Sequence, residues 1–169
     1  MERVEIILGD ITQIKVDAIV NAANPELMPG GGVSGAIHRA AGPSLAEACK
    51  KVAPCPPGEA RITPGFNLPA KYVIHTVGPT WNGGQSGEAR ILEAAYRNSL
   101  LLARQNQIRT IAFPSISTGI YGYPLHEAAP IALRVFKEEA HNFEKIYMVA
   151  YDKLTYQAYT EAWKSLSEG

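Results

Sequence analysis

Apolar and β-branched residues gather in short runs along the chain, and each run is bounded by Gly, Pro, Asn, Asp or a charged residue. Bounded runs of this kind are typical of strands buried in a sheet. They predict strands at Val4–Leu8, Ala18–Val20, Tyr72–Val77, Thr110–Phe113 and Ile146–Ala150, with a shorter one at Arg61–Pro64.

Between these runs, apolar positions recur three and four residues apart, which is the spacing of a helix with one apolar face. The spacing predicts helices around Ile91–Ala103, Ala128–Phe136 and Tyr156–Leu166, and small residues predict two more, at about Ser34–Ala41 and after Pro43. Because strands that alternate with helices are joined by right-handed crossovers, we expect a three-layer α/β/α fold with a largely parallel sheet. In such folds the ligand binds beyond the carboxyl ends of the strands.

Length and composition indicate a single soluble domain over residues 1–169, because 46% of the residues are hydrophobic and 19% are charged. No apolar run approaches the roughly 20 residues of a membrane-spanning helix. The first residues lack the basic start and apolar core of a signal peptide, so we expect a cytoplasmic protein that has no membrane partner.

The charge balance limits the kinds of ligand. Sixteen basic and sixteen acidic side chains cancel, which argues against nucleic acid as a partner. A small anion remains possible, since backbone N–H groups at helix N-termini and in glycine-rich turns bind phosphate without net positive charge. Cys49 and Cys55 lie in no metal-ligating spacing, and we expect neither a disulfide framework nor a metal site.

The stretch "NAANPELMPGGGVSGAIHRAAG", Asn21 to Gly42, follows one predicted strand and enters a predicted helix. Asn21 and Asn24 bring amide groups to the strand end, and the run Gly30–Gly32 lets the backbone approach a ligand closely. A flexible surface loop is the alternative interpretation. The position between a strand and a helix favours a ligand-binding loop.

A second stretch, "PSISTGIYGYP" from Pro114 to Pro124, also follows a predicted strand. The N–H groups of Ser117–Tyr121 could form an anion-binding nest ahead of the next helix. The pattern lacks the Gly-Lys-Ser/Thr of a Walker loop, and an ordinary strand-to-helix turn is an equal alternative when the motif is taken by itself.

Two further residues stand at predicted strand ends. Asp10 can cap the next turn or accept a hydrogen bond from the exocyclic amine of a base, and Tyr151 can stack on a base or pack at the rim. The two loops, the carboxylate and the aromatic ring share the ligand edge of the expected sheet. Together they predict a pocket for a nucleotide diphosphate.

At this point the chain resembles a known family. The segments "VDAIVNAAN", "VIHTVGP", "PSISTGIYGYP" and the glycine-rich stretch from Gly30 to Gly42 occur in the order and spacing of macrodomains, over essentially the whole chain. The chain is most similar to the bacterial branch related to ADP-ribosyl hydrolases and O-acetyl-ADP-ribose deacetylases. The resemblance implies a mixed six-stranded sheet, a cleft for ADP-ribose or an ADP-ribosylated protein, no cofactor, and a monomer.

The resemblance also implies roles for individual residues. Asp10 would accept from the adenine amine, Ile11 would add a backbone contact, Tyr151 would stack on the adenine, and Asn24 would bind the distal ribose hydroxyls. The diphosphate and distal ribose would be held by backbone N–H groups of two loops, which comprise Gly31, Gly32, Val33, Ser117, Thr118, Gly119, Ile120 and Tyr121.

One departure from the family concerns catalysis. Hydrolases of this family often carry Asp after Gly-Gly-Gly-Val, whereas this chain carries Ser34. A serine hydroxyl can orient a water but cannot take its proton near neutral pH. Three hypotheses follow: a weak hydrolase in which the substrate diphosphate positions the water and Asn24, Ser34 and Tyr121 shape the site; a reader that binds without turnover; or a hydrolase in which His38, at i+4 from Ser34, serves as the base.

Two other classes of protein also use glycine loops at strand ends. A dinucleotide oxidoreductase is disfavoured because Gly-x-Gly-x-x-Gly is missing after the first strand. RNA binding is disfavoured by the neutral charge. His75 lies inside an apolar run and is expected to be a core histidine that hydrogen-bonds to the backbone. We therefore expect an ADP-ribose-binding macrodomain with weak hydrolysis of ADP-ribosyl esters or O-acetyl-ADP-ribose.

Overall fold

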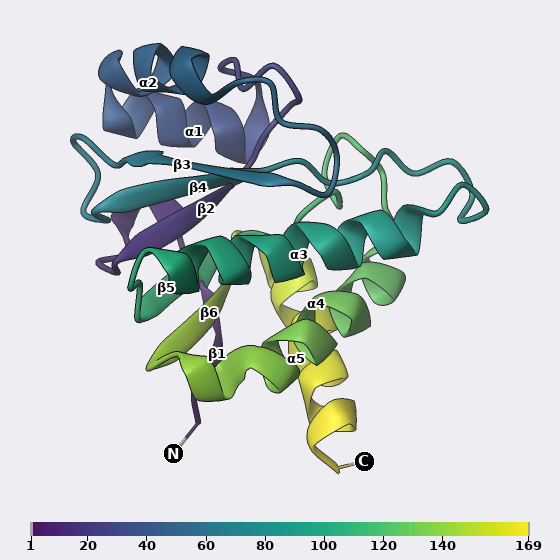
Figure 1. The fold of residues 1–169 in the computed structure, drawn as a ribbon. Helices are drawn as coiled ribbons and strands as arrows, with labels where there is room; N and C mark the ends of the chain where they lie inside the picture. The colour runs from purple at the N-terminus through teal and green to yellow at the C-terminus, as the bar shows by residue number, and fades with distance from the viewer. Residues whose placement is uncertain (1, 169) are drawn as a thin grey trace.

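The computed structural model describes residues 2–168 and contains a six-stranded sheet between two layers of helices (Figure 1). The strand order is β1-β6-β5-β2-β4-β3. All neighbouring pairs are parallel except β3 with β4, so the mixed, largely parallel sheet is confirmed. The strands are β1 (Val4–Leu8), β2 (Ala18–Ala22), β3 (Ala60–Pro64), β4 (Tyr72–Thr76), β5 (Thr110–Phe113) and β6 (Lys145–Ala150).

Five α-helices flank the sheet, with two short 3-10 turns, η1 (Ile11–Gln13) and η2 (Ala140–Asn142). The packing of their buried residues divides the helices into a pair on one face of the sheet and a trio on the opposite face, an arrangement that can be followed in Figure 1. The pair consists of α1 (Gly32–Ala41) and α2 (Ser44–Val52), and the trio of α3 (Glu88–Gln105), α4 (Leu125–Glu139) and α5 (Lys153–Glu168).

Alternation along the strands divides the core into two parts, because successive side chains point to opposite faces of a sheet. Ala18 and Val20 of β2 pack with the trio of helices, whereas Ile19 packs with α1 and α2. In β5, Phe113 packs with the trio of helices and Ala112 packs with α1 and α2. Every strand residue named here is buried, which is why β2 and β5 form near-continuous apolar runs in the sequence.

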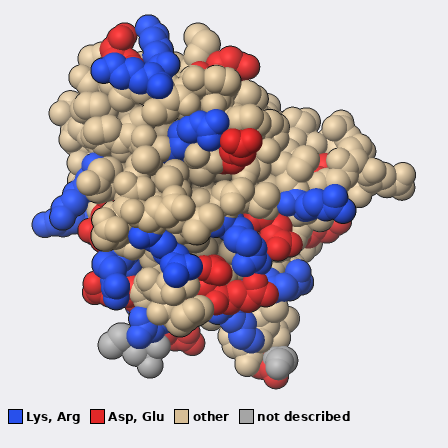
Figure 2. All heavy atoms as spheres, viewed as in Figure 1, with Lys and Arg blue, Asp and Glu red and all other residues tan. Residues whose placement is uncertain are grey.

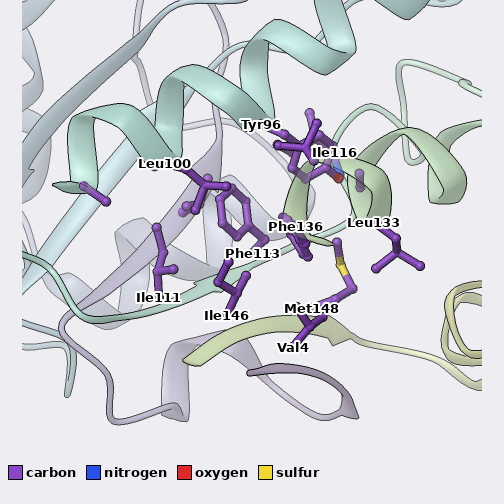
Figure 3. Packing of buried hydrophobic residues seen from close by; sticks show 14 of the residues in the cluster. Val4, Tyr96, Leu100, Ile111, Phe113, Ile116, Leu133, Phe136, Ile146 and Met148 are labelled. Atoms are coloured by element: carbon purple, nitrogen blue, oxygen red, sulfur yellow. The ribbon is translucent and has the colours of Figure 1, made fainter. Parts of the chain in front are cut away.

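An aromatic cluster joins the core to the ligand edge of the sheet. Tyr96 of α3 lies 5.4 Å from Phe113 and 5.7 Å from Phe136 between ring centroids, and Figure 3 shows these side chains gathered between α3, α4 and the sheet. The Tyr96 hydroxyl accepts the Ile116 N–H at 3.0 Å. A fully buried side chain therefore positions the backbone that follows β5.

Exposed charges of both signs intermingle over the surface of α3 and α4, as Figure 2 shows. Arg97 of α3 pairs with Glu93 at 3.0 Å and with Glu138 of α4 at 2.7 Å. Such exposed pairs contribute little to stability. None of the helices within residues 2–168 is both long and apolar enough to span a bilayer.

The strand order also fixes the order of the loops along one edge of the sheet. Five of the six strands run parallel, so their carboxyl ends meet at that edge. From one side to the other, the edge carries Asp10 after β1, Tyr151 after β6, residues 114–124 after β5, residues 23–31 after β2 and residues 77–87 after β4. Residues 23–31 are called loop 1, residues 114–124 loop 2, and residues 77–87 loop 3.

Candidate ligand-binding cleft

Loop 1 is held in shape by its own asparagine. The Asn24 side chain donates to the Met28 carbonyl and accepts from the Met28 N–H, both at 3.0 Å. Each amide atom keeps capacity for one more hydrogen bond, because the NH₂ has a second hydrogen and the oxygen a second lone pair. At its other end the loop packs directly on α1. The Gly30 carbonyl oxygen lies so close to Gly35 that a β-carbon on Gly35 would meet it at 2.5 Å.

The N-terminus of α1 presents unpaired donors to this edge. Gly31 is the N-cap and supplies no side chain, and Gly32 has a φ of +55°. Within residues 2–168 the N–H groups of Gly31, Gly32, Val33 and Ser34 donate to no protein acceptor. Free N–H groups at the positive end of a ten-residue helix are suited to an anion.

Loop 2 forms a second set of unpaired donors. Ser117 has a φ of +68°, a conformation that L-residues rarely adopt outside turns and functional sites. The Tyr123 N–H donates to the Ser117 carbonyl at 2.9 Å and closes the loop. In the described part of the chain, no N–H group from Ser117 through Thr118, Gly119 and Ile120 to Tyr121 has a protein acceptor. The predicted nest is therefore open to a ligand.

Loop 2 is anchored from beneath by a relay of hydroxyl groups. Thr118 donates to Ser115 Oγ at 2.7 Å, and Ser115 Oγ lies 2.7 Å from the hydroxyl of Tyr159, which is fully buried on α5. Together with the Tyr96 bond to Ile116, this relay holds the base of the nest rigidly.

Loop 2 approaches the end of loop 1 at the start of α1. The Cδ1 atom of Ile120 comes within 3.8 Å of the place where a β-carbon on Gly31 would stand. Ile120 is 89% exposed although it is apolar. Its side chain therefore lies between the donors of loop 2 and those of α1 and is free to pack on a ligand.

The other end of the edge carries a carboxylate and a ring. Asp10 Oδ1 accepts from the Thr12 N–H at 2.9 Å and from the Thr12 hydroxyl at 2.7 Å, so the capping role is observed. Asp10 is exposed, and its second oxygen has no protein donor among residues 2–168. Ile11, the first residue of η1, is buried, while Tyr151 is 80% exposed. The free carboxylate oxygen can accept from an amine donor, and the exposed ring can stack on a flat one.

Comparison with known proteins agrees with this geometry. Residues 20–132 match the family described as Macro domain. The chain belongs to the Macro domain family. A macro domain-containing protein of Lactiplantibacillus plantarum is 53% identical over 171 aligned residues, which is 99% of each chain. An O-acetyl-ADP-ribose deacetylase of Salmonella newport is 56% identical, covering 93% of this chain and 92% of the relative.

Solved structures share the fold. A mutant Oceanobacillus iheyensis macrodomain with ADP-ribose superimposes with a TM-score of 0.94 at 43% identity, covering 98% of this macro domain and 94% of that chain. The similarity to macrodomains inferred from the sequence is thereby confirmed.

Three buried hydroxyl and imidazole atoms of this macro domain have no hydrogen-bond partner in the described structure: Ser34 Oγ, Ser117 Oγ and His38 Nε2. Ser34 and Ser117 are 5% and 7% exposed. Ser34 and His38 lie four residues apart on α1, yet no hydrogen bond joins them. Burial lowers the pKa of His38, so its imidazole is neutral near pH 7. Unsatisfied buried atoms of this kind are places for a water or a ligand group.

A polar network in the core of the macro domain was not anticipated from the sequence. His75 is fully buried as expected, but its partners are side chains and not the backbone. Its Nδ1 lies 3.1 Å from Asn21 Nδ2, and its Nε2 lies 2.9 Å from Thr63 Oγ1 and 3.7 Å from Cys49 Sγ. Burial, aided by the nearby His38, lowers the pKa of His75 to about 3.

This network supports the cleft from within. Asn21 lies in β2, three residues before Asn24, so the neutral His75 side chain helps to hold the strand that begins loop 1. Cys49 and Cys55 are both buried, and burial raises the pKa of the Cys49 thiol to about 11. Among the residues that the structure describes, no group of three His, Cys, Asp or Glu side chains could hold a metal ion.

Proposed function

We propose that this macro domain binds ADP-ribose and slowly hydrolyses esters at its distal ribose, such as O-acetyl-ADP-ribose or the ADP-ribosyl ester of an acidic side chain. One observation carries the proposal: two sets of unpaired backbone N–H groups, at 31–34 and 117–121, follow the neighbouring strands β2 and β5 at one edge of the sheet, where Ile120 approaches Gly31. The name of the Salmonella relative and the ADP-ribose in the Oceanobacillus structure support it.

The adenine would lie at the β1–β6 end of the edge. The free oxygen of Asp10 would accept a hydrogen bond from the exocyclic amine, the backbone at Ile11 would lie beside the ring, and Tyr151 would stack on it. A hydrogen bond to a carboxylate is stronger than one between neutral groups. This end therefore supplies the selectivity for adenine.

The diphosphate would lie between the two sets of donors. Its negative charges need no lysine or arginine there, because the α1 dipole and the N–H groups of residues 31–34 and 117–121 supply partial positive charge. The chain has a net charge of zero, in keeping with recognition by the backbone. Gly31, Gly32 and Val33 would contact one side, and Ser117, Thr118, Gly119 and Ile120 the other.

The distal ribose would lie beside Asn24, Ser34 and Tyr121. Asn24 keeps one donor and one acceptor site free for the ribose hydroxyls. The unpartnered Ser34 hydroxyl can hydrogen-bond a water, and the substrate diphosphate would hold and polarise that water. Turnover is slow in this scheme because no carboxylate at position 34 takes the proton.

A reader without turnover is the second candidate function, and the serine at position 34 favours it. The third hypothesis, His38 as the base, has a neutral imidazole in its favour. However, Nε2 is buried and is not hydrogen-bonded to Ser34, so His38 is better placed to support α1.

Hydrolysis of O-acetyl-ADP-ribose distinguishes these functions when wild type is followed beside Ser34→Asp and Ser34→Ala, with ADP-ribose formation measured by chromatography. We expect slow release by wild type, faster release by Ser34→Asp, and less release by Ser34→Ala. If wild type binds the ester but releases no more ADP-ribose than buffer does, the hydrolase proposal fails and the reader remains.

A further inference from the structure

Loop 3 carries the dipeptide Asn82-Gly83 at an exposed position. The chain has seven asparagines, and Asn82 alone is followed by glycine. Both residues are exposed, and Figure 1 shows the segment that joins β4 to α3 projecting from the body of the protein. Because glycine has no β-carbon, its backbone nitrogen is open to the side-chain amide of the residue before it. The pair is therefore a place where the chain can react with itself.

The groups that such a reaction needs are free in the structure. Among residues 2–168 the Gly83 N–H donates to no protein acceptor, although the N–H groups of Asn82 and Gly84 on either side of it do. In the same part of the chain, the Asn82 side chain makes one contact, 3.5 Å from Nδ2 to the Thr80 carbonyl oxygen, which is too long for a strong hydrogen bond. A β-carbon on Gly83 would meet nothing within 4 Å. Neither the attacking nitrogen nor the leaving amide is protected.

The backbone on both sides of Gly83 is fixed by a buried carboxylate. Glu88, the first residue of α3, is 2% exposed. Its Oε2 accepts the N–H groups of Asn82 at 2.8 Å and Gly84 at 3.0 Å, and its Oε1 accepts the Ser86 N–H at 2.7 Å. Burial opposes ionisation, but these N–H donors outweigh it and lower the pKa of Glu88 to about 2. The donors thus satisfy a charge that would be costly to bury alone.

The two bonds to Oε2 also fix the length of backbone between Asn82 and Gly84. One residue separates these two donors, and both reach the same oxygen. The Trp81 ring packs against this segment so closely that a β-carbon on Gly84 would meet its Cη2 atom at 2.8 Å. An additional backbone atom between residues 82 and 84 would therefore break at least one of the bonds to Glu88.

We propose that Asn82 is a modification site: it deamidates in water without an enzyme, and the isoaspartate that forms separates loop 3 from Glu88. The reaction needs only water, so it does not depend on what the cleft binds.

The reaction has two steps. In the first, the Gly83 nitrogen forms a bond to Cγ of Asn82, the Cγ–Nδ2 bond breaks, and Nδ2 leaves as ammonia with the proton of the Gly83 nitrogen. In the second, the oxygen of a water bonds to one of the two carbonyl carbons of the resulting succinimide ring, and the bond from that carbon to the Gly83 nitrogen breaks. This nitrogen takes one proton of the water, and the new carboxylic acid gives the other to solvent.

The carbonyl carbon that the water attacks decides the product. Attack at Cγ gives aspartate on the ordinary backbone. Attack at the backbone carbonyl carbon gives isoaspartate, in which the main chain runs through Cγ and is one carbon longer. Isoaspartate therefore adds the backbone atom that the bonds from Asn82 and Gly84 to Glu88 do not accommodate.

The first test follows each asparagine of the purified protein by peptide mapping and mass spectrometry during incubation at neutral and at mildly alkaline pH. We expect Asn82 to be the first to exchange its amide for a carboxylate, and to react faster at the higher pH, because the Gly83 nitrogen attacks after it loses its proton. Asn67 is the internal control, since it is exposed, lies in a turn and is followed by leucine. An unchanged Asn82, or an Asn67 that reacts as fast, would overturn the modification site.

Asn82→Gln is the matched variant, because it keeps an amide and the backbone N–H but would need a larger and slower-forming ring. Isoaspartate is measured by methyl transfer from S-adenosylmethionine with a purified isoaspartyl methyltransferase. We expect label on incubated wild type and not on incubated Asn82→Gln. Equal labelling of the two proteins would place the reaction at another residue and overturn the proposal.

The effect on loop 3 is measured on deamidated protein, which ion exchange isolates by its extra negative charge. Asn82→Asp carries the same charge on the ordinary backbone. Because part of the deamidated protein is isoaspartate, it should unfold at a lower urea concentration than both wild type and Asn82→Asp. A midpoint equal to that of wild type, or an equal loss in Asn82→Asp, would overturn the separation of loop 3 from Glu88.

Discussion

The carbonyl oxygen of Gly30 occupies the space beside Gly35 so closely that a β-carbon on Gly35 would meet it at 2.5 Å. Loop 1 thus folds back onto the first turn of α1, and the N–H groups that begin this helix are fixed relative to Asn24. Glycine at position 35 is required by this close approach, not by an unusual φ.

Gly35→Ala should displace loop 1 and weaken ADP-ribose binding by tenfold or more. The clash involves backbone, which yields less readily than a side chain, so we also expect a loss of about 1–3 kcal/mol in the free energy of unfolding. Gly9→Ala is the control, because nothing lies within 4 Å of its added β-carbon. Calorimetry and denaturant unfolding test both effects. Normal binding by Gly35→Ala would show that loop 1 does not shape the site.

Asp10→Asn should separate the two roles of this residue. The amide oxygen can still accept from Thr12, so the η1 cap is kept, but the second atom becomes a donor that opposes the adenine amine. We expect ADP-ribose binding to weaken by about 1–3 kcal/mol with little change in stability. The analogue with hypoxanthine carries a carbonyl oxygen in place of the amine, so it should bind wild type more weakly than ADP-ribose does and should bind Asp10→Asn, whose NH₂ can donate to it, more tightly than wild type. Unchanged affinity for ADP-ribose would contradict the assignment.

Gly32→Glu should abolish binding, because it places a negative charge and a bulky side chain among the donors at the start of α1. Gly32 also has a φ of +55°, which a side chain tolerates poorly. Gln105→Glu makes the same change in charge at an exposed position at the end of α3 and should bind normally. The Kd of each variant is measured beside wild type. Binding by Gly32→Glu would show that the diphosphate lies elsewhere.

The buried His75 predicts a loss of stability in acid. Its pKa is lowered to about 3 in the folded state and is about 6.5 when unfolded, so the unfolded chain binds more protons as the pH falls through this window. The free energy of unfolding should therefore decrease from pH 6.5 toward pH 3, at up to about 1.4 kcal/mol per pH unit. The stability is fully present above pH 6.5.

His75→Gln should flatten this pH dependence, since glutamine keeps hydrogen-bonding atoms but does not titrate. The exposed residue His141 provides the control, and His141→Gln should behave as wild type. Urea unfolding at several pH values gives the slopes. An unchanged slope in His75→Gln would assign the acid sensitivity to other groups, of which Glu88 contributes in the same direction below pH 4.5.

The fold was predictable where the pattern of apolar residues is strong. Val4–Leu8 and Thr110–Phe113 match their strands at both ends, because both are short apolar runs with clear boundaries, although β5 is largely buried and the edge strand β1 is not. β2 continues two residues beyond the predicted Val20, since Asn21 is polar in sequence but is buried by its bond to His75. A partner 54 residues away leaves no local signal.

The candidate cleft was predictable in its loops but not in their supports. Glycines that follow predicted strands identified loops 1 and 2, since the sequence shows both the glycines and the strands. The supports depend on tertiary contacts that the sequence does not show. They are the hydrogen bond from the Ile116 N–H to Tyr96, the left-handed φ of Ser117, and the hydrogen bonds from loop 3 N–H groups to Glu88. Glutamate after Ser-Gly, three residues before the predicted helix at Ile91–Ala103, was the one available signal for the bonds to Glu88.

Calorimetric titration of wild-type protein with ADP-ribose tests the central claim most directly. The convergence of two sets of free N–H groups on one cleft predicts a single site with a Kd in about the micromolar range, and AMP, which lacks the second phosphate and the distal ribose, should bind more weakly. Absence of measurable binding to ADP-ribose, or equal affinity for AMP, would contradict the account.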